Sequence, residues 1–128
     1  NKNLTFTVED RRENIRRIAE VAKLFANCGI VTLASFISPT VEIRAIAKQI
    51  IGEENFVEVY VNASLELCET RDVKGLYQKA RKGIIKNFTG IDSPYEPPVQ
   101  PDVTIDTSLE LEESVKQLFD YINQDIAL

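Results

Sequence analysis

Three short runs of apolar residues, many of them β-branched, alternate with segments of helical periodicity, and this alternation constrains the fold more than any other feature. A continuous apolar run of this length is typical of a strand whose two faces are both buried. Strands that alternate with helices form a parallel sheet covered by helices on both faces. We therefore predict an α/β fold, a three-layer parallel sheet, in a single domain over residues 1–128. The predicted strands are IVTLASF (30–36), NFVEVYVNA (55–63) and PDVTIDT (101–107).

Helix signals lie between these runs. Apolar residues at helical spacing predict a first helix over 7–29, with Thr7 and Asp10 as its N-terminal capping signal. A second helix is predicted over 38–52, with Ser38 as its cap and Pro39 in its first turn. The remaining predicted helices cover residues 64–72, 74–83 and 108–122.

Charge is unevenly distributed along the chain. The net charge of −5 argues against a nucleic-acid polymer as a partner. Residues 11–23 and 71–86 nevertheless carry clusters of Arg and Lys. Two basic clusters in an acidic chain indicate a small polyanion bound locally. A solvated helix face would give the same pattern.

Composition excludes several classes of protein. The chain has no histidine, which rules out a histidine base and zinc bound by imidazole. Cys28 and Cys68 lack a Cys-x-x-Cys spacing and are best interpreted as reduced thiols of a cytoplasmic protein. No apolar run is long enough to cross a bilayer, and the N-terminal residues lack the apolar core of a signal peptide. We therefore expect no membrane association.

Segment 86–98, KNFTGIDSPYEPP, contains almost nothing that builds a helix or a strand. Loops with few core contacts usually connect or bind. Phe88 in this loop and Phe6 near the N-terminus belong to no periodic apolar stripe, and each lies beside a basic cluster. A planar base stacks on such rings, whereas a phenylalanine that covers the edge of the core would look the same. The spacing does not decide between the two.

The second basic cluster has the pattern of a lid over residues 71–92. Gly75 and Gly83 bracket its central part, as expected of a mobile segment. Arg71 and Lys74 stand at its start, where their charged groups could meet phosphate. Ser38 offers a further anion site if the N–H groups of its helix accept sulfate or phosphate, although a capping role alone explains it.

The first basic cluster leaves two interpretations open. On a helix, Arg11 and Asn14 share a face at positions i and i+3, and together they could hold an anionic, hydrogen-bonding ligand. Alternatively, Glu13 pairs with Arg16 or Arg17, and the cluster serves only the helix.

Two long motifs carry a resemblance to a known family. The strings FTVEDRRENIRRIAEVAKLFANCGIVTLASFISP and RDVKGLYQKARKGIIKNFTGIDSPYEPP resemble adenylylsulfate kinase (APS kinase), also found as the kinase domain of PAPS synthetases. The likeness extends over residues 4–107. It implies a fold of the P-loop nucleotide-kinase type. It also implies transfer of the ATP γ-phosphate to the 3′-hydroxyl of adenosine 5′-phosphosulfate (APS), giving PAPS in sulfate assimilation, with Mg²⁺ accompanying ATP.

The resemblance also implies roles for particular residues. Two rings sandwich the APS adenine, two polar residues of the first helix grip the phosphosulfate and ribose, and the end of the first strand lies beside the sulfate. A lid lysine acts in catalysis, and a serine is phosphorylated in some members of the family. By this resemblance, the catalytic residues are Lys74 and Ser38, the serine open to phosphorylation, and Arg71 and Thr107 lie near ATP. The APS-binding residues implied in the same way are Phe6, Arg11, Asn14, Ile37, Ser38, Lys74, Asn87, Phe88 and Thr89.

The sequence also departs from the family. It contains no Gly-x-x-x-x-Gly-Lys-[Ser/Thr] phosphate loop and no acidic stretch for metal contacts. We expect both upstream of residue 1, so that the chain is the C-terminal two-thirds of the domain, carries no metal ligands and is inactive alone. Val73 replaces the usual lid proline, and Thr40-Val41 replace an aromatic–Arg pair, whereas Arg44 is kept and retains some electrostatic support.

Two functions from different classes fit these residues. The first is an APS kinase whose substrates are ATP and APS. The second is an inactive regulatory domain that only binds PAPS or APS, as in fungal ATP sulfurylases. The resemblance further implies that the natural protein can form a homodimer and can be fused to, or associated with, ATP sulfurylase.

Overall fold

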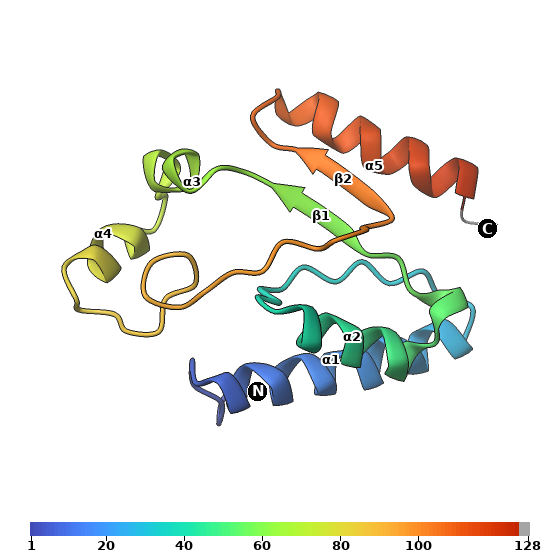
Figure 1. Ribbon diagram of the computed structural model, residues 1–128. Coiled ribbons are helices and arrows are strands. Elements are labelled where there is room, and N and C mark those ends of the chain that lie inside the picture. Colours follow the sequence, from blue (N-terminus) through green and yellow to red (C-terminus); the bar gives the residue numbers. More distant parts are fainter. Residues whose placement is uncertain (126–128) are drawn as a thin grey trace.

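Figure 1 shows the computed structural model, which describes residues 1–125. The last three residues of the predicted domain, 126–128, lie outside the described part of the chain. The elements follow in the order α1 (Val8–Asn27), α2 (Val41–Ile51), the short 3₁₀ turn η1 (Glu53–Asn55), β1 (Val59–Asn62), α3 (Leu65–Arg71), α4 (Leu76–Arg81), β2 (Val103–Asp106) and α5 (Leu111–Asp125).

The predicted parallel pairing is confirmed for two of the three strands. β1 and β2 are adjacent and parallel, with Val59 opposite Val103 and Asn62 opposite Asp106. The connection between them carries α3 and α4, which lie beyond the carboxyl end of β1, and then the proline-rich loop, which runs back from α4 towards the start of β2 (Figure 1). This arrangement places the lid and the loop at the edge of the sheet where ligands of parallel α/β proteins gather.

The predicted strand over 30–36 is wrong for the described residues. The segment runs as an extended chain, but it has no strand partner within residues 1–125. Its apolar side chains are exposed, with Leu33 at 74% and Phe36 at 54% of their accessible surface. A strand exists only where a neighbouring backbone lies about 4.8 Å away to share hydrogen bonds. The apolar sequence predicts burial and cannot supply that neighbour.

One helix cap is confirmed and one is corrected. The hydroxyl of Thr7 accepts a hydrogen bond from the backbone N–H of Asp10 (3.2 Å), as the capping signal predicts. Ser38, by contrast, does not cap α2. Thr40 does, since its hydroxyl accepts from the N–H of Ile43 at 3.3 Å. Both residues fit the capping pattern, and helix ends are the least certain part of such a prediction.

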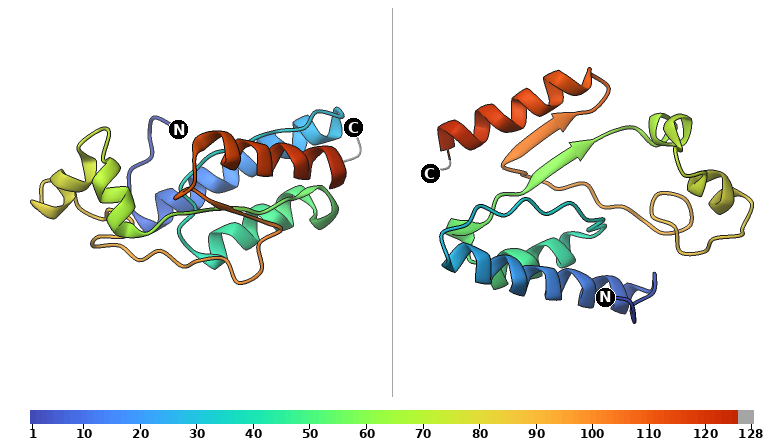
Figure 2. Two further views of the ribbon diagram at one scale, coloured as in Figure 1. Left: turned by 90° about the horizontal axis from the view of Figure 1, so that it is seen from above. Right: turned by 180° about the vertical axis from the view of Figure 1, so that it is seen from behind.

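The elements form three layers, as predicted. α1 and α2 pack against each other on one side of the sheet, while α5 packs against β2 on the other (Figures 1 and 2). The most buried apolar side chains of the described residues belong to α1, α2, α4 and β2: Ile15, Ala19, Ile43, Ala80 and Ile105. The core is therefore small, and a broad apolar surface stays open between the layers.

Candidate functional site

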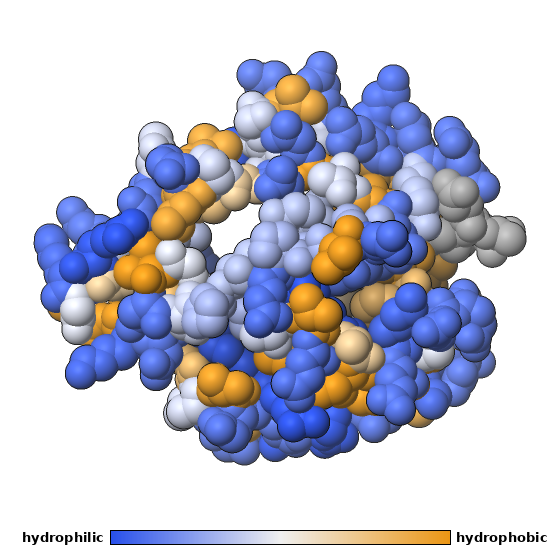
Figure 3. All heavy atoms as spheres, viewed as in Figure 1, coloured by the Kyte–Doolittle hydropathy of each residue, from blue (hydrophilic) through white to orange (hydrophobic). Residues whose placement is uncertain are grey.

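An open cavity of about 1910 Å³ lies between the extended segment 30–38, β1, α1 and the lid. Figure 3 shows an opening in the molecular surface between the β1–α3 connection and the proline-rich loop. Most of the predicted site residues line this cavity: Phe6, Arg11, Ile37, Ser38, Arg71, Lys74, Asn87, Phe88 and Thr89. Asn14 and Thr107 do not line it. The fold thus brings together residues from both ends of the chain.

Arg11 connects the N-terminal segment to the proline-rich loop. Its Nε donates to the carbonyl oxygen of Phe6 (3.1 Å), and its Nη2 donates to the carbonyl oxygen of Asn87 (2.6 Å), 76 positions away. The guanidinium carbon also lies 5.7 Å from the centre of the Phe6 ring, within the range of a cation–π contact. Burial lowers the pKa of the Arg11 guanidinium. The group stays charged at any physiological pH, so Arg11 brings a positive charge to the cavity between the two predicted rings.

The loop that carries Phe88 is closed by its own hydrogen bonds. The carboxylate of Asp92 accepts from the backbone N–H groups of Asn87 and Phe88, at 2.8 and 2.5 Å. Burial raises the pKa of this carboxyl, but the two N–H donors outweigh burial and hold the pKa below its usual value. Asn87 has φ 57°, a left-handed conformation that asparagine tolerates better than most residues. Asp92 thereby determines where the backbone of Phe88 lies.

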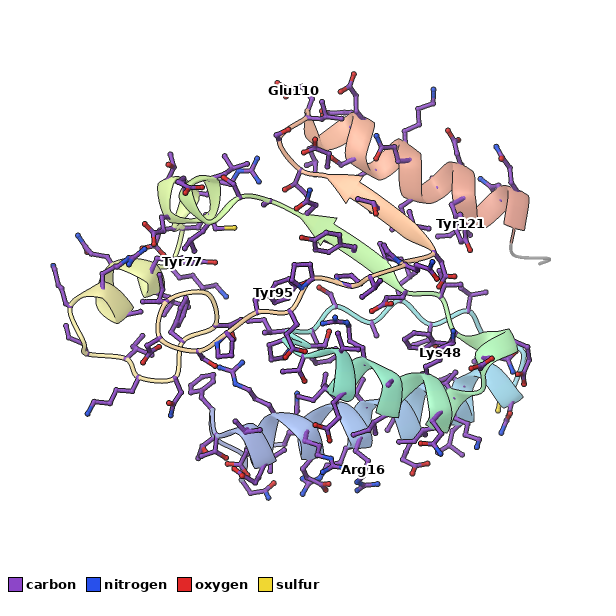
Figure 4. The ribbon with its side chains drawn as sticks, in the orientation of Figure 1. Arg16, Lys48, Tyr77, Tyr95, Glu110 and Tyr121 are labelled. Carbon is purple, nitrogen blue, oxygen red and sulfur yellow. The ribbon has the colours of Figure 1, made fainter. Side chains whose placement is uncertain are left out.

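The Phe88 ring contacts the lid helix α4. Its centre lies 4.9 Å from that of Tyr77, with an angle of 74° between the ring planes, an edge-to-face pair. Tyr77 comes from α4 (Figure 4) and also lines the cavity. Burial, followed by a hydrogen bond with Cys68, raises the pKa of Tyr77 to about 12. The phenol of Tyr77 is therefore neutral. Phe88, one of the two rings predicted to bind adenine, thus packs against the lid.

The base of the lid is tied to the carboxyl end of β2. Arg71 donates to the carbonyl oxygen and the hydroxyl of Thr107. The Thr107 hydroxyl in turn donates to the carbonyl oxygen of Asn62 (2.9 Å), so both strand ends and the lid share one hydrogen-bonded cluster. Arg71 lines the cavity, and Thr107, which does not, holds the Arg71 guanidinium through these hydrogen bonds.

Lys74 is the cation of the predicted set that has no partner within residues 1–125. It is exposed, follows α3 and makes no hydrogen bond or ion pair with any residue in 1–125. The turn after it is well ordered, because the carboxylate of Asp72 accepts from the N–H groups of Tyr77 and Gln78, both at 3.0 Å. The hydrogen bond from the Gln78 N–H, the largest contribution, lowers the pKa of Asp72. The ammonium of Lys74 is thus available for an anion in the cavity.

The alternative interpretation of the first basic cluster applies to part of it. Glu13 pairs with both Arg16 and Arg17, each at 2.7 Å, and their hydrogen bonds lower the pKa of Glu13 to about 2. Those two arginines therefore belong to the helix surface. Asn14, predicted to contact ligand, accepts a hydrogen bond from the side chain of Asn1, and its role in binding stays a prediction.

Sequence reasoning missed three residues that shape this site: Tyr77, Asp92 and Glu96. A signal existed for Asp92, since an Asp that follows Thr-Gly in a loop commonly bonds to nearby backbone N–H groups. No local pattern points to Tyr77 or Glu96, whose partners lie on other elements. Within residues 1–125, no three His, Cys, Asp or Glu side chains gather as a metal-binding group. No helix there has the length and apolarity that a membrane crossing requires.

A parallel sheet between helical layers, with cations and aromatic rings at the carboxyl ends of its strands, is the arrangement of α/β proteins that bind nucleotide-like anions. The comparisons specify the class further. The sequence model of the family described as "Adenylylsulphate kinase" matches residues 1–106. The chain is 58% identical over 123 residues to the adenylyl-sulfate kinase of Phocaeicola vulgatus, covering 95% of this chain and 60% of that protein. It is 54% identical over 125 residues to the enzyme of Clostridium acetobutylicum, covering 97% and 62%.

A solved structure agrees with these relatives. The structure of the Mycobacterium tuberculosis APS kinase CysC, in complex with AMPPNP and APS, matches with a TM-score of 0.91 and 42% identity, over 96% of this chain and 72% of that one. The chain belongs to the adenylylsulphate kinase family. The predicted fold class, of the P-loop nucleotide-kinase type, is confirmed. The chain spans about 60% of the length of the curated relatives named above.

Proposed function

We propose that the natural protein containing this chain is an adenylyl-sulfate kinase that transfers the γ-phosphate of ATP to the 3′-hydroxyl of APS. The product is PAPS, the reaction belongs to sulfate assimilation, and the site of action is the cytoplasm. The contact that carries the proposal is that of Arg11, which joins the segments of Phe6 and Phe88 beside one cavity. This contact joins the two segments that carry the rings which, by family resemblance, clamp a purine.

The site residues then divide by the part of the substrate that they meet. Phe6 and Phe88 hold the adenine of APS by stacking, which is worth about 1–3 kcal/mol per base. Arg11 and Asn14 meet the phosphosulfate and ribose, with the end of the extended segment, Ile37 and Ser38, beside the sulfate. Asn87 and Thr89 shape the loop on either side of Phe88. The support for this division is the common cavity that most of these residues line.

The reaction itself needs positioning and charge stabilisation more than covalent chemistry from the protein. Lys74 supplies a positive charge that meets the transferred phosphoryl group when the lid closes over the cavity. Arg71 and Thr107 occupy the neighbouring site for ATP. Ser38 takes a second role if it is phosphorylated, as in some relatives.

Mg²⁺ accompanies ATP in reactions of this class. Residues 1–125 do not offer a cage of three or more His, Cys, Asp or Glu side chains for a magnesium ion held by the protein alone. No step of the reaction is therefore assigned to the ion.

Homodimerisation and association with ATP sulfurylase are separate proposals. Size-exclusion chromatography with light scattering of the natural protein tests both.

The test is turnover of APS by the natural protein with Mg·ATP, measured as PAPS formed. We expect Lys74→Ala to remove most of the activity. Lys82→Ala is the matched control, because Lys82 is an exposed lysine of the same lid that does not line the cavity. Binding of APS or PAPS without any turnover would contradict the kinase function and favour an inactive regulatory domain. Full activity of Lys74→Ala would show that Lys74 has no catalytic role.

A further inference from the structure

Arg44 is a buried cation outside the set of predicted substrate contacts. Only 9% of its surface is exposed, although it lies in the first turns of α2, where arginines are usually solvated. A buried charge persists only where its donors are satisfied by partners. The partners of Arg44 therefore indicate what it does.

Each part of the guanidinium contacts a different segment of the chain. Nη1 donates to the carbonyl oxygen of Ser38 (2.8 Å), and Nη2 donates to the carbonyl oxygen of Glu96 (2.7 Å), 52 positions away. Nε lies 2.7 Å from the Oε1 oxygen of Glu58, which precedes β1. That oxygen has no well-aligned hydrogen bond, so the contact is an ion pair. One rigid group thus connects the end of the extended segment, the proline-rich loop and the sheet.

Three further contacts reinforce the same junction. The backbone N–H of Glu96 donates to the carbonyl oxygen of Pro39, and its carboxylate accepts from the N–H of Val41 at the start of α2, both at 2.7 Å. Tyr95, labelled in Figure 4, stacks on Tyr60 of β1, with ring centres 6.4 Å apart and an angle of 18° between the planes. The segment 95–96 is therefore held against both α2 and the sheet.

We infer that Arg44 is a positioning residue, which holds the end of the extended segment (Ile37 and Ser38) at a defined distance from the loop that carries Phe88. The inference rests on the proposed function for the identity of the ligand. Arg44 lines the same cavity, but Nη1, Nη2 and Nε each already contact an oxygen of the protein, so it is not assigned to the substrate. Its planar fork reaches three carbonyl or carboxylate partners, whereas a lysine presents a single point charge on a flexible stem. Loss of the fork would separate the sulfate end of the site from the adenine end.

The test compares Arg44→Lys with wild type in the natural protein. We expect KM for APS to rise about 10-fold to 100-fold, the effect of losing one or two hydrogen bonds to a charged donor. KM for ATP should change by less than about 2-fold, since Arg71 and Thr107 are tied to β2 and not to this junction. Hydrogen exchange at the amides of Val41 and Glu96 should become faster. Arg12→Lys is the matched control, because Arg12 of α1 makes an exposed ion pair with Glu42 of α2 and takes no part in the junction.

The outcomes separate the positioning role from general stability. A rise in KM for APS alone, together with faster exchange at the two amides, supports the inference, and Arg44→Gln should strengthen both effects. Equal changes in both KM values, or no change in exchange, would overturn it. If wild type shows no kinase activity, the proposed function fails and the exchange measurement decides by itself. Faster exchange at the Val41 and Glu96 amides in Arg44→Lys, but not in Arg12→Lys, would then support the positioning role of Arg44. Equal exchange in the two variants would contradict it.

Discussion

Replacement of the Phe88 ring should weaken APS binding without opening the loop that carries it. The backbone of Phe88 is held by Asp92 and, through Asn87, by Arg11, and none of these contacts involves the ring. Within the chain the ring contributes its edge-to-face pair with Tyr77, worth about 0.5–1.5 kcal/mol. Because the half-buried ring also loses its apolar burial, Phe88→Ala is expected to lower the free energy of unfolding by at least about 1 kcal/mol.

The effect on the ligand is expected to be larger. Stacking on an aromatic ring is worth about 1–3 kcal/mol per base, which corresponds to a rise in Kd for APS of about 5-fold to 150-fold. Phe88→Leu separates stacking from filled volume, since leucine keeps an apolar side chain without a π face. We expect it to bind APS nearly as weakly as Phe88→Ala while it is more stable.

Isothermal titration of APS into the natural protein measures Kd, and chemical unfolding measures stability. Phe119→Ala is the control, because Phe119 is 60% exposed on α5 and lies outside the cavity. If Phe88→Ala binds APS within 2-fold of wild type while its loop amides stay protected, the ring does not hold the adenine. The stacking account would then be refuted.

Three further changes test other parts of the structure. Asp92→Asn should speed amide exchange at Asn87 and Phe88, because the amide oxygen that remains is a weaker acceptor than the carboxylate; unchanged exchange would contradict the role of Asp92. Glu13→Gln should destabilise the protein above about pH 4.5. Because the pKa of Glu13 is lowered to about 2 in the folded state, this difference in urea midpoint should shrink as the pH falls from 4.5 towards 2. Thr40→Ala should cost about 1 kcal/mol of unfolding free energy by removing the α2 cap, and Ser38→Ala less; equal losses would restore Ser38 as the cap.

Local patterns predicted most of the helices and two of the strands. The periodicity of α1 and the hydroxyl of Thr7 act over three or four residues, and such short-range interactions are visible in the sequence. The choice between Ser38 and Thr40 was less accessible, since both side chains can cap and the path of Pro39 decides between them. The extended segment 30–36 shows the limit most clearly, because its apolar residues specify burial but not a pairing partner.

The candidate site also has a part that the sequence predicts and a part that only the fold decides. Family motifs in the sequence alone indicate Phe6, Arg11, Lys74 and Phe88. Their meeting in one cavity depends on contacts between distant positions, such as that of Arg11 with Asn87. Asp92 and Tyr77 escaped notice because the sequence does not show what a loop carboxylate or a helix aromatic will touch.

By itself, the sequence determined the alternation of helices and strands, the basic clusters and the membership of the family, because these depend on residue type and spacing along the chain. Only the tertiary structure decided that Arg44 is buried and that it joins Ser38 to Glu96. The physical reason is that burial and hydrogen-bond partners across 52 positions follow from how the layers pack, a property that no short stretch of sequence contains.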